Sequence, residues 1–455
     1  MGLYQVAIGF VGSVTGLGIS GSGVREVAES HAARNHRQMA ARIKTLRRAC
    51  WITGLFGWFV TILMAQPLST WIFGSLERAN SIAVLGATLL LAAIGGAQNV
   101  VLQGTRRIGD LARAGVLGML ASTLVAVALY GWFGEQGIVP VMLSTAAINL
   151  SLSWWFARKV QLETVIQPLA ETVSNIRRLL GLGVALMWGG VMTAALFLGI
   201  RSLIIRELGL DASGIYQAAW GTSGMLAGFI LGAMGTDFYP RLTAVAKDDA
   251  AANRLVNEQT EIGILLALPG LLGTLAFAPF AMQVFYTAQF LPGEELLPWF
   301  VLGVFGRVVS WPLGFLQLAK GASRCFATTE TGMVALQFGL VLWLLKELGL
   351  PGIAIAYAIT YGFYIVGMLV VGHRLSGFCW STEVWRLLML AGALVAGGFA
   401  VQMWIPGIAG PVVGGSLTLA SGFICLRGLA RRLSPDHRLT RLVCRLPGGH
   451  RIWQD

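Results

Sequence analysis

Long apolar segments alternate with short polar ones through nearly the whole chain of 455 residues. Segments of about 20 residues with few or no charges are typical of helices that cross a membrane. The pattern therefore predicts an all-α, polytopic membrane protein with about thirteen transmembrane helices. The expected spans are 3–24, 50–73, 82–102, 114–132, 137–157, 182–207, 214–238, 263–286, 296–319, 329–345, 352–373, 386–405 and 409–427.

The composition agrees with this pattern, because 56% of the residues are hydrophobic and only 12% are charged. A formal net charge of +12 would suggest a nucleic-acid partner in a soluble protein. Here the cations gather in alternate loops, as the positive-inside rule predicts: segment 25–49 is rich in Arg and Lys, whereas 74–81 and 132–136 are not. We therefore expect a multi-pass membrane location with a cytoplasmic C-terminus, and membrane lipids rather than nucleic acid as partners.

The five cysteines are scattered, without a Cys-x-x-Cys motif or a neighbouring His pair. This spacing favours neither a disulfide framework nor a metal site. The nucleotide-binding pattern Gly-x-x-x-x-Gly-Lys-Ser/Thr does not occur in the sequence either. We expect no cofactor and no metal, and an ion gradient of protons or sodium as the driving force for any transport.

The chain contains a duplication. Gly2-Leu3-Tyr4-Gln5 matches Gly214-Ile215-Tyr216-Gln217, and the same offset places Pro67 on Pro279. We expect two parallel repeats with the transport pathway between them. The predicted parts are an N-terminal lobe of five helices at 1–160, a cytoplasmic linker at 161–181, a six-helix lobe at 182–375, two appended transmembrane helices at 376–430 and a basic cytoplasmic tail at 431–455.

The second repeat begins with a helix that has no counterpart before Gly2. We therefore expect that the first lobe lacks its first helix, and that coding sequence upstream of Met1 encodes it.

The repeated helix carries small residues every four positions, among them Gly224 and Gly228. Small residues at this spacing allow close helix packing. Two interpretations remain open: static packing, or a moving helix that lines the cavity between the lobes. The expected cavity-lining residues are Tyr4, Gln5, Tyr216, Gln217, Gly224 and Gly228.

Three charged residues stand out inside or at the end of the expected spans. Arg307 lies halfway along 296–319 and Arg201 in the outer part of its helix. An arginine at the centre of a span costs about 2.5–3.5 kcal/mol on insertion scales unless it faces water or a partner. Because guanidinium groups bind phosphate through two parallel hydrogen bonds, both arginines favour an anionic, phosphate-bearing substrate. Asp237 closes the repeated helix, which we expect Pro240 to end, and is the residue for ion coupling or gating.

The segment GIYQAAWGTSGMLAGFILGAMGTDFYPRL, together with LFLGIRSLIIRELG and LGVFGRVVSWPLGFLQLAKGASR, resembles the signature of Wzx-type O-antigen and lipid-linked oligosaccharide translocases of the multidrug/oligosaccharidyl-lipid/polysaccharide exporter superfamily. The resemblance covers about residues 1–375. It implies a flippase, not an enzyme, that moves undecaprenyl-pyrophosphate-linked oligosaccharide by alternating access, with polysaccharide polymerase machinery as a further partner. It also implies substrate contacts for Arg201 and Arg307. Val304 stands where that family often carries an acid, which directs ion coupling to Asp237.

Other functions remain open at this point. A peptidoglycan-precursor flippase and a drug/cation antiporter belong to the same superfamily, although an antiporter should carry more buried carboxylates. A membrane-embedded glycosyltransferase or polymerase would require acid and base residues in its outside loops. The outside loops of this chain are short and poor in such residues.

Overall fold

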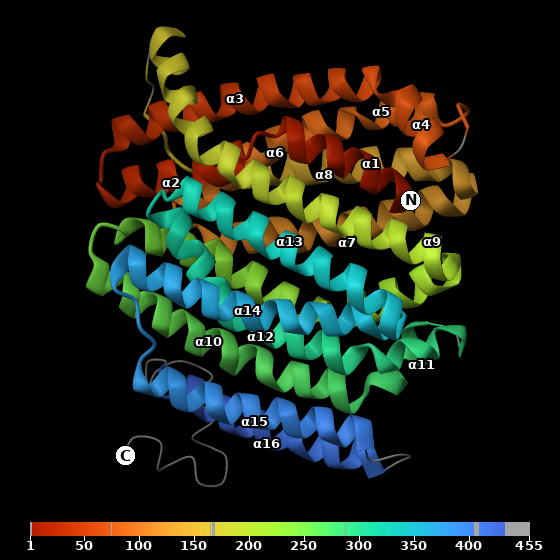
Figure 1. Cartoon of the computed structure of the whole chain (residues 1–455). Coiled ribbons are helices and arrows are strands. Elements are labelled where there is room, and N and C mark those ends of the chain that lie inside the picture. The colour runs from red at the N-terminus through yellow and green to blue at the C-terminus, as the bar shows by residue number, and fades with distance from the viewer. Residues whose placement is uncertain are drawn as a thin grey trace. The chain divides into compact units, whose positions relative to one another are not determined.

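The structure is a computed structural model that describes residues 2–73, 75–163, 165, 169–286, 288–404 and 409–432. Within these residues every regular element is a helix (Figure 1). The predicted tail at 431–455 lies outside the described residues beyond position 432, and the predicted linker at 161–181 is described only in part.

The helices before residue 160 are α1 (Gly2–Thr15), α2 (Ile19–Ala32), α3 (His36–Leu63), α4 (Ala65–Phe73), α5 (Ala79–Leu85), α6 (Ala87–Gly104), α7 (Ile108–Phe133), the short 3-10 helix η1 (Gly134–Gly137) and α8 (Ile138–Ala157). The later helices are α9 (Leu169–Ala244), α10 (Asp249–Ala276), α11 (Ala278–Phe285), the 3-10 helix η2 (Ala288–Glu295), α12 (Leu297–Ala319), α13 (Ser323–Leu348), α14 (Leu350–Ser376), α15 (Thr382–Trp404) and α16 (Ala409–Ala430).

The described residues divide into two compact units. Unit 1 draws on Met1–Ala195, Thr236–Val245 and Leu318–Glu330, and unit 2 on Leu196–Gly235, Ala246–Gln317 and Thr331–Asp455. Helix α9 therefore contributes to both units. The lobe boundaries predicted from the duplication stay a prediction.

Ten helices among the described residues are long and apolar enough to cross a membrane. They overlap ten of the expected spans, and the prediction of an all-α polytopic membrane protein is confirmed. On α7, Met119 is 73% exposed and Trp132 is 79% exposed, as expected of side chains that contact lipid tails. The other three expected spans, 3–24, 50–73 and 214–238, have a different construction.

The span expected at 3–24 is broken between α1 and α2. Leu17 and Gly18 have φ values of 48° and 61°, in the left-handed region that interrupts an α-helix. A Cβ atom at Gly18 would lie 2.1 Å from the carbonyl oxygen of Gly183 in α9. Glycine at position 18 is therefore required both by the backbone conformation and by the close approach of α9.

The span expected at 50–73 is broken at Met64, between α3 and α4. Pro67 lies in the first turn of α4, where a helix has no use for the missing N–H group. The second repeat shows the same arrangement, because α10 ends at Ala276 and Pro279 lies in the first turn of α11. The matched prolines thus mark matched interruptions.

The span expected at 214–238 forms the second part of α9. Gly209, with φ 89° and ψ 175°, separates this part from the preceding helical segment. The expectation that Pro240 ends the helix is wrong, because α9 continues past it to Ala244. Only one turn follows the proline, so the interruption of the hydrogen-bond ladder affects the end of the helix alone.

The appended helices α15 and α16 lie side by side and pack against α10 in unit 2 (Figure 1). Gly414 allows α16 to approach α10 closely, since a Cβ atom there would lie 2.8 Å from that of Ala276. At the far end, the Arg432 Nε atom donates to Glu261 Oε2 over 2.7 Å. Small residues and one ion pair therefore hold the appended pair to the bundle.

Candidate functional site

Arg201 and Tyr216 lie on opposite sides of Gly209 in α9, both in unit 2. The positive charge of Arg201 lies close enough to act on the Tyr216 hydroxyl. The Tyr216 side chain is buried and that of Arg201 is partly exposed. The kink of α9 at Gly209 therefore lies between Arg201 and Tyr216, which is one of the first residues of the repeated segment.

Tyr216 begins a continuous cluster of aromatic rings in unit 2. Its ring lies 5.8 Å from that of Phe300 in α12, and Phe300 lies 5.4 Å from Trp220. Trp220 in turn contacts Tyr357 in α14, with ring centroids 4.8 Å apart, and Phe197 in α9, at 5.4 Å. All these pairs meet edge to face, the arrangement that the charge distribution of aromatic rings favours.

Arg307 of α12 lies at the other end of this cluster. Its guanidinium interacts with the buried Tyr357 side chain, which also interacts with Tyr361 one turn further along α14. Glycine at position 303 makes this possible, because a Cβ atom there would lie 2.2 Å from the Tyr357 ring. Arg307 itself is partly exposed.

The structure thus brings Arg201 and Arg307 to one aromatic cluster, although they are far apart in the sequence. Sequence reasoning identified the two arginines and Tyr216 but missed Trp220, Phe300 and Tyr357. The missed rings did leave a signal: Trp220 follows Tyr216 by one helical turn, and Tyr361 follows Tyr357 in the same way. Two permanent cations beside flat apolar rings suit a ligand with phosphate and sugar groups.

Asp237 belongs to unit 1 and forms two ion pairs. Its Oδ1 atom lies 3.3 Å from Arg106 Nη2, and its Oδ2 atom lies 3.4 Å from Arg241 Nη1. All three side chains are more than a third exposed, and such pairs contribute about 0–1 kcal/mol each. Asp237 is therefore a paired surface acid at the end of α9.

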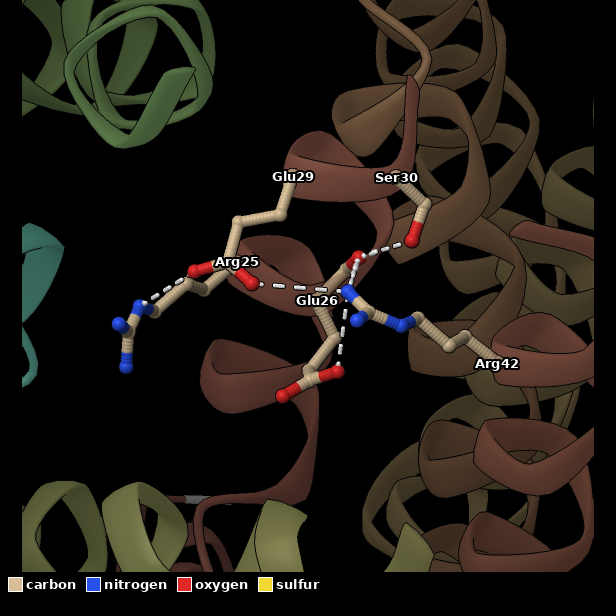
Figure 2. Close-up of polar contacts among 5 residues, drawn as sticks. All are labelled: Arg25, Glu26, Glu29, Ser30 and Arg42. Atoms are coloured by element: carbon tan, nitrogen blue, oxygen red, sulfur yellow. Dashed lines mark hydrogen bonds and ion pairs between the residues drawn. The ribbon is translucent and has the colours of Figure 1, made fainter. Parts of the chain in front are cut away.

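The residue that matches Asp237 in the first repeat is Arg25, which pairs with Glu29 over 3.2 Å. Figure 2 shows this pair beside a second one, in which Arg42 of α3 reaches Glu26, 3.1 Å away, and Glu29. The side chains of Arg42 and Glu26 are only 11% and 15% exposed. This second pair fastens α2 to α3.

The remaining predicted residues of the repeated helix lie in different surroundings. Tyr4 is buried and lines a cavity of about 480 Å³ in unit 1, together with Arg78 and Gln136. Gln5 and Gln217 are exposed. Cβ atoms at Gly224 and Gly228 would meet no atom within 4 Å, so no described side chain packs onto these two glycines.

A buried acid that sequence reasoning missed is Glu261 in α10, which is 9% exposed. It precedes the apolar part of α10 and pairs with Arg432 at the end of α16. The signal in the sequence is weak, since Glu261 looks like an ordinary charge at the border of a span. Its position assigns it to the docking of the appended helices.

Comparisons with known proteins agree with this fold. Residues 2–294 match the family model of polysaccharide biosynthesis proteins. The lipid III flippases of Escherichia coli K12 and Shigella flexneri are each 21% identical over 376 residues, which cover 79% of this chain and 86% of theirs.

Two solved structures share the fold. A MOP superfamily transporter from Pyrococcus furiosus has a TM-score of 0.69 at 16% identity, over 85% of this chain and 87% of its own. An outward-facing multidrug resistance MATE family transporter of the same superfamily has a TM-score of 0.67 at 16% identity, over 85% and 88% of the two chains. This chain therefore has the fold of these transporters, and it belongs to the polysaccharide biosynthesis protein family.

Proposed function

We propose that the protein is a flippase that moves a polyprenyl-pyrophosphate-linked oligosaccharide, the repeat unit of O-antigen or another surface polysaccharide, across the bacterial inner membrane. The observation that carries the proposal is the convergence of Arg201 and Arg307 on one aromatic cluster in unit 2. The family match and the names of the two flippase relatives support a lipid-linked glycan as substrate.

The physical problem of such a substrate is its headgroup. Each hydroxyl or amide without a hydrogen bond costs several kcal/mol in hydrocarbon, on the order of 4–8 kcal/mol. Arg201 and Arg307 bind the pyrophosphate through paired, charge-assisted hydrogen bonds and so replace part of its hydration. The polyprenyl tail can stay in the bilayer while the headgroup crosses.

An ion gradient drives the cycle. One elementary charge moved across 100 mV supplies roughly 2.3 kcal/mol, enough to bias two conformations of a transporter. Asp237 takes the role of coupling or gating residue, because its carboxylate joins the end of α9 to Arg106 and also pairs with Arg241. The C-terminus lies on the cytoplasmic side in this scheme.

Deletion of the gene tests the proposal. We expect lipid-linked oligosaccharide to accumulate on the inner leaflet and surface glycan to disappear. Wild-type protein and the control variant Arg206→Ala, which removes an exposed arginine five residues after Arg201, should restore export, and Arg201→Ala should not. Normal glycan export in the deletion strain, or accumulation of a peptidoglycan precursor instead, would contradict the proposed substrate.

A further inference from the structure

The duplication provides an internal reference for the aromatic cluster, because the matched positions of the second repeat have counterparts in the first. The offset that matches Tyr216 with Tyr4 also matches Trp220 with Ile8. The matches of the later helices extend the comparison. The cluster residues Tyr216, Trp220, Phe300, Tyr357 and Arg307 correspond to Tyr4, Ile8, Ala83, Met142 and Leu90.

The counterparts in the first repeat form an ordinary apolar core. Tyr4 and Ile8 are buried in one cluster, against which Ala83 and Met142 pack. The same helical framework is therefore filled by aliphatic side chains and one tyrosine. The cluster residues of the second repeat that have no aromatic or charged counterpart are Trp220, Phe300, Tyr357 and Arg307. Packing alone does not require them.

Trp220 contacts three other rings of the cluster. It meets Phe197, Phe300 and Tyr357 at interplanar angles of 65°, 80° and 86°, and these three contacts together determine the plane of the indole. Unlike Phe300 and Tyr357, the Trp220 side chain is not buried but partly exposed. Part of an immobilised aromatic surface thus remains available to a ligand.

We propose that Trp220 is a stacking platform for a hexopyranose ring, the sugar that follows the phosphate in the substrate. The inference rests on the proposed function and adds to it a subsite for the glycan. One face of a pyranose presents apolar C–H groups, which carry partial positive charge and fit the negative face of an indole ring. Arg307 and Arg201 act on tyrosines of the same cluster, which provides cations for the phosphate and a ring for the first sugar.

Two lipid probes test the inference: undecaprenyl pyrophosphate, and the same lipid with one N-acetylglucosamine attached. Binding is measured by native mass spectrometry on the full chain in nanodiscs. Wild-type protein should bind the sugar-bearing lipid about fivefold more tightly, the factor that one aromatic contact of ordinary strength supplies. Trp220→Ile, which introduces the residue of the first repeat, should abolish this preference without changing the affinity for the sugar-free lipid.

Two further variants control for loss of the ring itself and for general effects on folding. Trp220→Phe retains an aromatic face and should retain most of the preference. Trp299→Leu removes a partly exposed tryptophan of α12 that contacts Phe399 of α15 instead, and should leave both affinities unchanged.

Each possible result decides between the two claims. Equal binding of both lipids by the wild-type protein overturns the sugar subsite and leaves the flippase proposal intact, and this comparison needs no variant. A sugar preference that persists in Trp220→Ile overturns the assignment to Trp220. Binding of neither lipid contradicts the proposed function, and the subsite with it.

Discussion

The two copies of the repeated segment fold differently although their sequences match over many positions. In the first copy the helix breaks at Leu17 and Gly18, and α2 starts in a new direction. In the second copy Ile230 stands at the position of Gly18, and α9 continues without a break. A β-branched residue disfavours the left-handed conformation that the break requires. The residue at this position therefore contributes to the difference between the bent and the straight helix.

The two copies also differ in the ion pair near the end of the repeated segment. Both carry an ion pair at the i, i+4 spacing, but the signs are reversed: Arg25 pairs with Glu29, whereas Asp237 pairs with Arg241. The neighbours from other elements differ as well, since Arg25 lies against Gly321 and Asp237 accepts a hydrogen bond from Arg106. The i, i+4 spacing of the ion pair is common to both copies, whereas the sign of the charge at the first position differs.

The largest expected effect concerns a cation present only in the second repeat. Arg307→Ala should abolish export of surface glycan at unchanged protein abundance. The counterpart of Arg307 in the first repeat is Leu90, so the first repeat has no cation at the matching position. Lys346→Ala, which removes an exposed cation from α13, is the control and should export normally. Export by Arg307→Ala at the wild-type level would remove the difference in function between the repeats.

The second effect concerns the bend. Gly18→Ala should lower the free energy of unfolding by about 2 kcal/mol or more, because φ is 61° and the new methyl group would collide with the Gly183 carbonyl. Gly224→Ala in the straight copy should be neutral or stabilising by up to about 1 kcal/mol, since the site is helical and open. Thermal unfolding in detergent compares the two variants, and equal midpoints would show that the bend does not depend on Gly18.

A smaller effect is expected at the reversed ion pair. Asp237→Asn should cost no more than about 1 kcal/mol of stability, because its two ion pairs are exposed and screened by solvent. It should nevertheless slow transport if Asp237 couples to the ion gradient. Chemical denaturation and a transport assay separate the two, and a variant with normal transport at all proton gradients would exclude the coupling role.

The smallest effect is a pH dependence confined to the first copy. Burial, followed by the charges of His36 and Arg106, lowers the pKa of His31, whereas the matching residue in the second copy is Thr243. As the pH falls below 6.5, the unfolded chain therefore binds a proton more readily, and stability decreases. His31→Gln should reduce this acid sensitivity in melting curves recorded between about pH 5 and 8. An identical pH profile in wild type and variant would contradict it.

Much of the fold was predictable from the sequence because hydrophobic length and charge placement respond to the bilayer directly. The apolar pattern predicts 50–73 and 263–286 as continuous spans and so missed the interruptions near Pro67 and Pro279. The duplication itself followed from the printed residues. The bend at Gly18 did not, since a glycine in an apolar run is equally compatible with a straight helix. Whether it bends depends on the approach of Gly183, a residue far along the chain.

The site was predictable only in part for a similar reason. A charge within an apolar span is conspicuous, so Arg201 and Arg307 stood out. Aromatic residues such as Trp220 and Phe300 are common in membrane helices, and only their contacts reveal a cluster. The first repeat has an aliphatic core at the matching positions, and this contrast is what directed the proposal to the aromatic cluster of the second repeat.

The central claim is that the second repeat, and not the first, holds the substrate headgroup. Photocrosslinking with an undecaprenyl pyrophosphate that carries a photoreactive group near the phosphate, followed by peptide mapping, tests it most directly. The account predicts labelled peptides from α9 around Arg201 to Trp220, from α12 around Arg307 and from α14 around Tyr357. Labelling of the counterparts in α1, α6 and α8 in their place would contradict it.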